Sequence, residues 1–185
     1  MGVYYEEIPD SLKSWILTQK MLWVGSAPLS GDGHINISPK GGPDFFGVVS
    51  PTQFWFMDLT GSGVETTAHL HEPGNGRICV MFMAFEGAPK IIRIWGKGRA
   101  IENDGQEGSE FGTFVKENSV KTYPGTRSII LVDVEQVGSS CGFSVPFYDF
   151  KGFRRTLDDF FKKKDDGDMV KYASSSIFSR QSWIC

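Results

Sequence analysis

The feature of this sequence that most constrains its fold is a series of short apolar stretches with only short helical segments between them. Within 34–40 apolar and polar residues alternate, as in a half-buried strand, and 54–57 are apolar throughout, as in a central strand. A doubly wound sheet would alternate strands with helices, so the pattern favours a mainly antiparallel β-barrel with a few peripheral helices. The predicted strands are about seven, at 21–27, 34–40, 45–49, 53–59, 77–85, 91–101 and 128–137, with a further candidate at 141–145.

Helical signals are few and short. Apolar residues at helical spacing predict a helix from about residue 10 to about residue 20. Weaker signals lie at 64–70, 109–117 and 156–164. The chain has 185 residues and no internal repeat, which is the length of one domain. We therefore expect a single domain over residues 1–165 and a Ser-rich, loosely ordered tail over residues 166–185.

Composition and charge exclude several functional classes. The formal net charge is −3, so binding to nucleic acid through bulk positive charge is not expected. The longest apolar run, 78–85, is too short to cross a bilayer, and the acidic N-terminus lacks an apolar signal core. The three cysteines are scattered and form no Cys-x-x-Cys pair. We therefore expect a protein of the reducing cytoplasm, without disulfides, zinc or a membrane anchor.

Common catalytic motifs are absent from the sequence. It contains no Walker A loop, no Gly-x-Ser-x-Gly elbow and no His-Glu-x-x-His. A helix would turn the rings of His69 and His71 apart, and only His34 could join them, so we predict no metal site. Histidines near the end of a helix are also favoured by the helix dipole. No residue stands out as a general acid or base, so the catalytic residues are unknown.

Polar residues on one face of the predicted strand 34–40 form the first candidate feature. Asn36, Ser38 and Lys40 alternate with apolar residues and therefore share a face. Lys40 would bring a positive charge to any anionic ligand that this face binds.

The second candidate feature is the turn Asp-Leu-Thr-Gly-Ser-Gly-Val-Glu-Thr, residues 58–66, where a central strand ends and a helix begins. Free backbone N–H groups in such a turn can hold an anion, and Thr60, Ser62 and Thr66 add hydroxyl donors. Taken alone, the sequence of this turn favours a capping box over an anion site, with Ser62 as the cap and Glu65 three residues later. Because Glu65 opposes a phosphate, a cation such as Lys40 or Arg93 has to compensate.

The third candidate feature is a basic and aromatic face of the predicted strand 91–101. Arg93, Trp95, Lys97 and Arg99 share this face, and small or apolar residues form the other. This pattern is typical of a solvated outer face of a barrel. It fits a wall beside a phosphorylated planar cofactor equally well.

The order of these segments resembles that of the pyridoxamine 5′-phosphate oxidase-like, FMN-binding split-barrel proteins. The resemblance is closest to a small fungal and bacterial branch related to pyridoxamine phosphate oxidase but without an assigned substrate, and it extends from about residue 8 to 164. The segments that carry it are Gly-His-Ile-Asn-Ile-Ser-Pro-Lys-Gly (33–41), the 58–66 turn, Ile-Trp-Gly-Lys-Gly-Arg (94–99) and Ser-Cys-Gly-Phe-Ser-Val-Pro (140–146).

The resemblance implies a six-stranded antiparallel split β-barrel that forms a homodimer, with FMN in each of two clefts between the subunits. Lys40 and the 60–66 turn would hold the ribityl phosphate, and the main chain of Asp58 and Leu59 would lie beside the flavin ring. The cofactor-binding residues predicted in this way are Asn36, Ser38, Lys40, Asp58, Leu59, Thr60, Ser62, Thr66 and Arg93.

Two departures from the family pattern bear on activity. Val64-Glu65-Thr66 replaces the basic residues that oxidases of the family commonly carry, and the C-terminal Arg-x-His element that grips the substrate phosphate is absent. We therefore expect an FMN-dependent oxidoreductase that acts on an unidentified small molecule and is not a true pyridoxamine phosphate oxidase. The alternatives are a non-catalytic flavin-binding or sensing protein, a haem-binding protein that uses its histidines, and a scaffolding dimer without cofactor.

Overall fold

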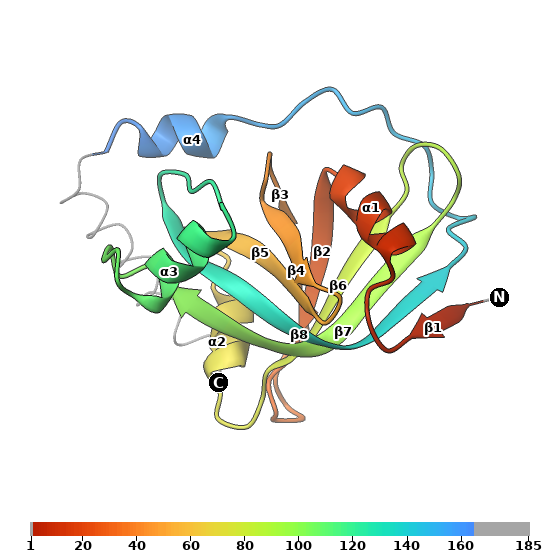
Figure 1. Cartoon of the computed structure of the whole chain (residues 1–185), viewed down its shortest axis with the longest axis horizontal. Coiled ribbons are helices and arrows are strands. Elements are labelled where there is room, and N and C mark those ends of the chain that lie inside the picture. Colours follow the sequence, from red (N-terminus) through yellow and green to blue (C-terminus); the bar gives the residue numbers. More distant parts are fainter. Residues whose placement is uncertain (1, 165–185) are drawn as a thin grey trace.

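The computed structural model describes residues 2–164, in which eight strands form one curled antiparallel sheet (Figure 1). The sheet order is β3-β2-β6-β7-β8-β5-β4, with β1 paired to β8. Since β3 and β4 stand at opposite ends of this order without pairing, the barrel is split between them. The strands are β1 (Val3–Tyr5), β2 (Met21–Ser26), β3 (Asn36–Gly41), β4 (Phe46–Ser50), β5 (Gln53–Leu59), β6 (Arg77–Met83), β7 (Ile91–Glu102) and β8 (Thr126–Ser140).

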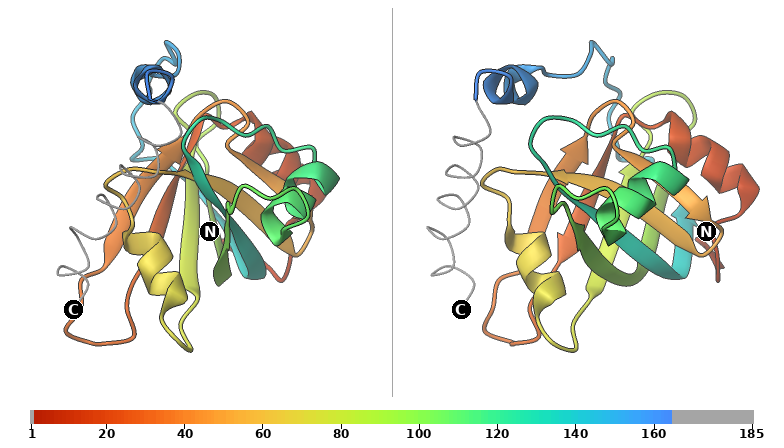
Figure 2. Two further views of the ribbon diagram at one scale, coloured as in Figure 1. Left: turned by 90° about the vertical axis from the view of Figure 1, so that its left-hand side faces the viewer. Right: turned by 60° about the vertical axis from the view of Figure 1, so that its left-hand side comes forward.

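Four short helices accompany the sheet in the described part of the chain, and none of them is long and apolar enough to span a membrane. They are α1 (Asp10–Thr18), α2 (Glu65–His71), α3 (Glu110–Glu117) and α4 (Thr156–Phe161). Figure 2 shows α2 and α3 on separate flanks of the curled sheet. The predicted split barrel is therefore confirmed.

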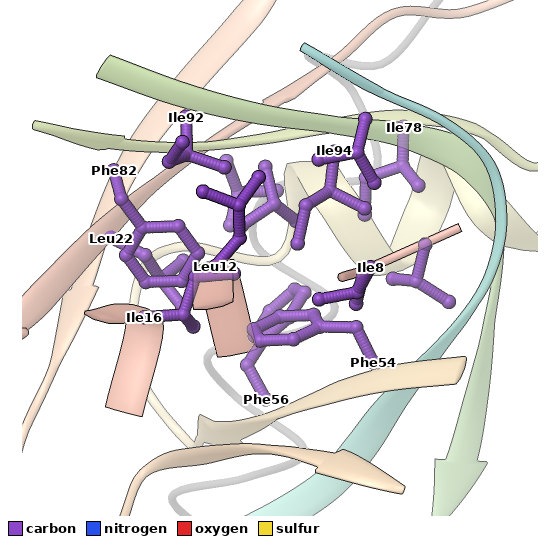
Figure 3. Close-up of a cluster of buried hydrophobic side chains, with 14 of the residues drawn as sticks. Ile8, Leu12, Ile16, Leu22, Phe54, Phe56, Ile78, Phe82, Ile92 and Ile94 are labelled. Atoms are coloured by element: carbon purple, nitrogen blue, oxygen red, sulfur yellow. The ribbon is translucent and has the colours of Figure 1, made fainter. Parts of the chain in front are cut away.

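The main core lies inside the curl of the sheet and is rich in phenylalanine. Phe54 and Phe82 meet edge to face, with ring centroids 5.9 Å apart, and both are fully buried (Figure 3). The helix α1 packs Leu12 and Ile16 into the same cluster, as its apolar spacing predicted. Burying a side chain of this size contributes about 2 kcal/mol, so the strands and α1 stabilise one another.

A second core explains why β5 is apolar on both faces. Met57 and Trp55 lie outside the main core and pack with Ile129 and with Phe111 of α3. The strand lies between β4 and β8, so its prediction as a central strand is confirmed.

Some sequence expectations differ from the structure. The sheet has eight strands where the family resemblance implied six, partly because Val3–Tyr5 adds a short strand along Val137–Ser139 of β8. The candidate strand at 141–145 is wrong, since β8 ends at Ser140 and a turn follows. The predicted tail, residues 166–185, lies outside the described residues, so the domain boundary at 165 stays a prediction.

Residues 141–155, here called the strap, follow β8 without regular secondary structure and pass over the ends of β2 and β3 towards α4 (Figure 1). Two hydrogen bonds tie the strap to the loop after β6: Tyr148 N donates to Phe85 O at 3.1 Å, and Phe150 N donates to Glu86 Oε1 at 3.2 Å. Beyond the strap, Phe161 of α4 is buried.

Candidate functional site

A buried carboxylate at the end of β5 joins two cations. The Asp58 side chain is only 3% exposed, and its Oδ1 lies 2.7 Å from Lys40 Nζ. Its Oδ2 accepts hydrogen bonds from Arg127, at 3.0 Å from Nε and also from Nη2. Thr67 Oγ1 approaches the same oxygen at 3.4 Å. A buried charge needs such partners, because an unpaired carboxylate would be costly to remove from water.

The position of this cluster follows from the topology of the sheet. Lys40 lies on β3 and Asp58 on β5, and these strands are not neighbours in the hydrogen-bonding order. Their ion pair therefore connects the two sides of the split in the barrel. Arg127 is close because β8 pairs with β5, Asp58 lying opposite Ser128, and a register shift follows at Leu59.

Both cations lie next to the glycine turn that leads into α2. Arg127 Nη2 donates to the carbonyl oxygen of Gly63 at 3.0 Å. A Cβ built on Gly63 would be 4.0 Å from Lys40 Nζ, so the ammonium group reaches the same peptide unit. Thr60 N donates to Gly125 O at 2.8 Å, which holds the start of the turn.

The capping-box interpretation of this turn is wrong. The cap of α2 is Val64, not Ser62, and it makes no side-chain capping bond. Ser62 is exposed and lies two residues before Val64, too early to cap a helix that begins at Glu65. Its hydroxyl is therefore not committed to the helix and remains available as a donor at the turn.

The polar face of β3 meets the first turn of α2. Asn36 Nδ2 donates to Ser38 Oγ at 3.1 Å and to Thr66 Oγ1 at 3.3 Å. Side chains at alternate positions of a strand share a face, which places Lys40 on this face too. The structure thus brings Asn36, Ser38, Lys40 and Thr66 together with the turn, as the sequence order suggested.

Arg93 is the predicted site residue that the structure does not bring to the turn. It lies on β7 opposite Met81 and Gly138. Asp58 lies opposite Ser128 of β8, ten residues from Gly138, which is about 30 Å along the strand. The neighbour of Arg93 on the same face, Arg99, instead pairs with Glu110 at 2.6 Å on the surface.

Arg127 is the residue that sequence reasoning missed. It lies in β8, between the buried residues Thr126 and Ser128, and nothing in the sequence nearby points to a ligand. Only the pairing of β8 with β5 shows that it faces Asp58. Its Nη1 is buried and has no hydrogen-bond partner within the described residues.

The same end of the barrel opens into a groove of about 1490 Å³, here called the strap groove. Lys40 and Leu59 line it on the side of the glycine turn, and the strap lines the opposite side. Leu59, a predicted flavin contact, is thus half-buried at the wall of a cavity large enough for a cofactor.

Two of the three histidines, His69 and His71, hold structural contacts. Ser26 Oγ lies 2.9 Å from His69 Nδ1 in a buried contact between β2 and α2. Burial lowers the pKa of His69, and the nearby carboxylates of Glu72 and Glu65 partly offset this. His71 Nε2 lies 3.0 Å from Glu102 Oε1 at the surface. Within residues 2–164 no three His, Cys, Asp or Glu side chains lie close enough together to hold a metal ion.

Comparisons with known proteins show what this chain is similar to. No protein-family model matches the chain. A curated pyridoxamine 5′-phosphate oxidase family protein of Aspergillus flavus is 44% identical over 151 residues, which are 80% of this chain and 58% of that protein. The chain therefore spans little more than half the length of this relative.

Solved structures share the fold at low sequence identity. A candidate pyridoxamine 5′-phosphate oxidase from Lactobacillus delbrueckii superposes with a TM-score of 0.51 at 13% identity, covering 72% of this chain and 94% of that one. The FAD binding protein of Mycobacterium smegmatis superposes with a TM-score of 0.47 at 11% identity, covering 72% and 96%. The likeness to the first shows the fold alone.

Proposed function

Because the chain belongs to the pyridoxamine 5′-phosphate oxidase-related split-barrel family, we propose that it binds FMN and acts as a flavin-dependent oxidoreductase on a small molecule. The observation that carries the proposal is the pair of cations, Lys40 and Arg127, beside the glycine turn. They meet one buried carboxylate, Asp58, which leaves a formal excess of one positive charge. Glu65, at the start of α2, formally cancels this excess, so the phosphate contacts rest on the positions of the two cations and not on a net positive charge.

The residues at the turn fit a phosphate group. Lys40 is 17% exposed at its side chain and can turn a proton towards an anion while it stays near Asp58. Exposed Ser62 and the hydroxyl of Thr66 add neutral donors, and charge-assisted hydrogen bonds to phosphate are among the stronger ones in proteins. Half-buried Leu59 would face the flavin ring along the groove wall.

The redox chemistry would be that of the flavin, which accepts or donates a hydride or single electrons. The chain would bind the cofactor, orient it and exclude water from part of it. We assign no general acid or base among the described residues. The missing Arg-x-His element points to a substrate other than pyridoxamine phosphate.

We also propose that the chain is a homodimer with the flavin between subunits. The strap supports this, because Phe143 and Phe147 are 82% and 81% exposed. Exposed apolar groups gathered on one segment are typical of interaction surfaces. The cytoplasmic location stays a prediction.

The test compares FMN with riboflavin, which lacks the phosphate. Purified protein is incubated with each flavin, and binding is followed by the visible absorption of the retained flavin and by titration. We expect about one FMN per chain and much weaker binding of riboflavin. FAD, titrated in the same way, shows whether the site accepts the larger cofactor. Protein that takes up no flavin would contradict the proposal.

Lys40→Ala makes the test specific to the phosphate. The variant should bind FMN at least about tenfold more weakly, because a charge-assisted contact is lost, while riboflavin affinity stays the same. Lys116→Ala removes an exposed lysine on α3, far from the turn, and serves as the control. An unchanged ratio of FMN to riboflavin affinity in Lys40→Ala would remove Lys40 from the phosphate site.

A further inference from the structure

The strap groove has an aromatic lining. On one side lies the outer face of β2 and β3, where Trp23 is half-buried opposite Pro39, and on the other lies the strap. Leu22 and Val24 point to the opposite face, into the main core, so the outer face of β2 is free to line the groove. The aromatic residues that line the groove are Trp15, Trp23, Phe45, Phe85, Tyr148, Phe150 and Phe153.

The charges around the groove favour an anion. Four cationic side chains line it (Lys20, Lys40, Arg154 and Arg155) against the two carboxylates of Glu86 and Asp149. This is a formal excess of two positive charges.

The two arginines at the end of the strap are available for a ligand. Arg154 and Arg155 are exposed and make no side-chain ion pair with other described residues. Lys20 Nζ, by contrast, lies 5.7 Å from the centre of the Phe150 ring, a cation–π contact. Lys40 already forms an ion pair with Asp58.

The size of the groove leaves room beside a flavin. Ligand pockets are usually about 300–1,000 Å³, and this groove is about 1490 Å³. The proposed phosphate site uses its Lys40 and Leu59 end. The end formed by Tyr148, Phe150 and Arg154 would then stay open for a second molecule.

We propose that the strap end of the groove binds a planar aromatic acid, with its ring against Tyr148 and Phe150 and its anionic group held by Arg154 and Arg155. A guanidinium group matches a carboxylate, sulfonate or phosphate through two parallel hydrogen bonds. Aromatic walls favour a flat apolar body through stacking and area burial. The proposal rests on the proposed function, because such a molecule would be the substrate that lies beside the flavin.

The test uses two probes that differ only in the anion. The first is 8-anilinonaphthalene-1-sulfonate, and the second is N-phenyl-1-naphthylamine, which has the same rings without the sulfonate. Both are titrated by calorimetry into full-length protein, as purified and after saturation with FMN. We expect the sulfonate to bind more tightly than the neutral probe, and its advantage to shrink at high salt.

Arginine variants assign the difference to the strap. Arg154→Ala combined with Arg155→Ala should weaken sulfonate binding about tenfold and leave the neutral probe unchanged. Arg154→Lys with Arg155→Lys keeps the charge but loses the paired hydrogen bonds of the guanidinium, so it should keep only part of the affinity. The matched control is Lys162→Ala with Lys163→Ala, which removes two exposed charges that do not line the groove.

Three results would overturn the proposal. The first is unchanged sulfonate affinity in the Arg-to-Ala variant, and the second is an equal loss of affinity for both probes. The third is displacement of the sulfonate by FMN, because the flavin would then occupy the whole groove. Protein that retains no flavin but shows the arginine-dependent difference would refute the proposed function and still support the ligand class of the groove.

Discussion

The Asp58 carboxylate is the residue on which the polar cluster depends. Replacing it by Asn would leave Lys40 and Arg127 partly buried without the carboxylate that they share. Breaking a buried ion pair by removing one partner is strongly destabilising, so we expect Asp58→Asn to lose about 3 kcal/mol of unfolding free energy. Urea unfolding, followed by tryptophan fluorescence, measures the loss.

Asp133→Asn is the matched control for this variant. Asp133 is exposed and accepts a hydrogen bond from Gln53 Nε2 at 2.9 Å. Surface changes of this kind alter stability by about 0.5 kcal/mol or less. Equal losses in the two variants would mean that the Asp58 cluster contributes nothing special to stability.

His69 is expected to make stability depend on pH. Burial lowers its pKa in the folded chain below the ordinary value of about 6.5. As the pH falls below about 6.5, the unfolded chain therefore takes up the proton first, and the free energy of unfolding decreases. Above that pH the histidine is neutral in both states and contributes no pH dependence.

His69→Gln tests this dependence. Thermal unfolding at about pH 7.5 and about pH 5.5 should show a smaller loss of stability on acidification in the variant than in the natural chain. Ser26→Ala removes the 2.9 Å contact but keeps the buried histidine, so it should keep the dependence. The same acid sensitivity with and without His69 would assign it to other groups.

At the level of single residues, the sequence predicted the site where neighbours along one strand carried the signal. Asn36, Ser38 and Lys40 alternate on β3, and the strand period alone puts them on one face. Arg127 could not be predicted, because its meeting with Asp58 depends on the register between β5 and β8. The structure does not bring Arg93 to the glycine turn, because the register of β7 on β8 places it opposite Gly138; its role in binding a cofactor stays a prediction.

The ring of Phe161 packs α4 against Gly125 of the barrel. Gly125 has a φ of +82°, and a Cβ there would lie 2.4 Å from the Phe161 ring. Gly125→Ala therefore combines backbone strain with a clash, and we expect it to cost about 2 kcal/mol and to release α4. Thermal unfolding and limited proteolysis after the strap report the two effects.

Phe161→Ala removes the ring from the same contact. The side chain is 2% exposed, so its loss should cost about 3 kcal/mol. Because the ring then no longer blocks a Cβ at Gly125, the double variant should lose less than the sum of the single variants. Strictly additive losses would show that the two residues do not act through one contact.

Elements with a strong local pattern were predicted well, and elements defined by distant partners were not. The apolar run in β5 and the alternation in β7 follow from their own residues. The short strand β1 exists only because β8 is long enough to pair with it along Val137–Ser139. The predicted Ser62 cap was wrong because the turn is held by Arg127 and by Gly125 O, so α2 begins at Glu65.

At the scale of the whole molecule, the split in the barrel, the ion cluster and the strap meet at one end. Lys40 connects the two sides of the split through Asp58 and also lines the strap groove. A ligand at this end would contact both sides of the sheet and the strap. Binding should therefore raise the unfolding temperature of the barrel, since a ligand that binds only the folded state stabilises it.

The proposed homodimer leads to the last prediction, because a flavin held between subunits links cofactor binding to association. Light scattering after gel filtration should give the mass of two chains, and FMN should make the dimer persist to lower protein concentration.

Phe143→Ser with Phe147→Ser replaces two strongly exposed rings of the strap. If these rings lie at the interface, the variant should dissociate more readily and bind FMN more weakly. Both rings are on the surface, so the fold itself should keep its unfolding temperature. A stable monomer that binds one FMN would show that the groove of a single chain completes the site.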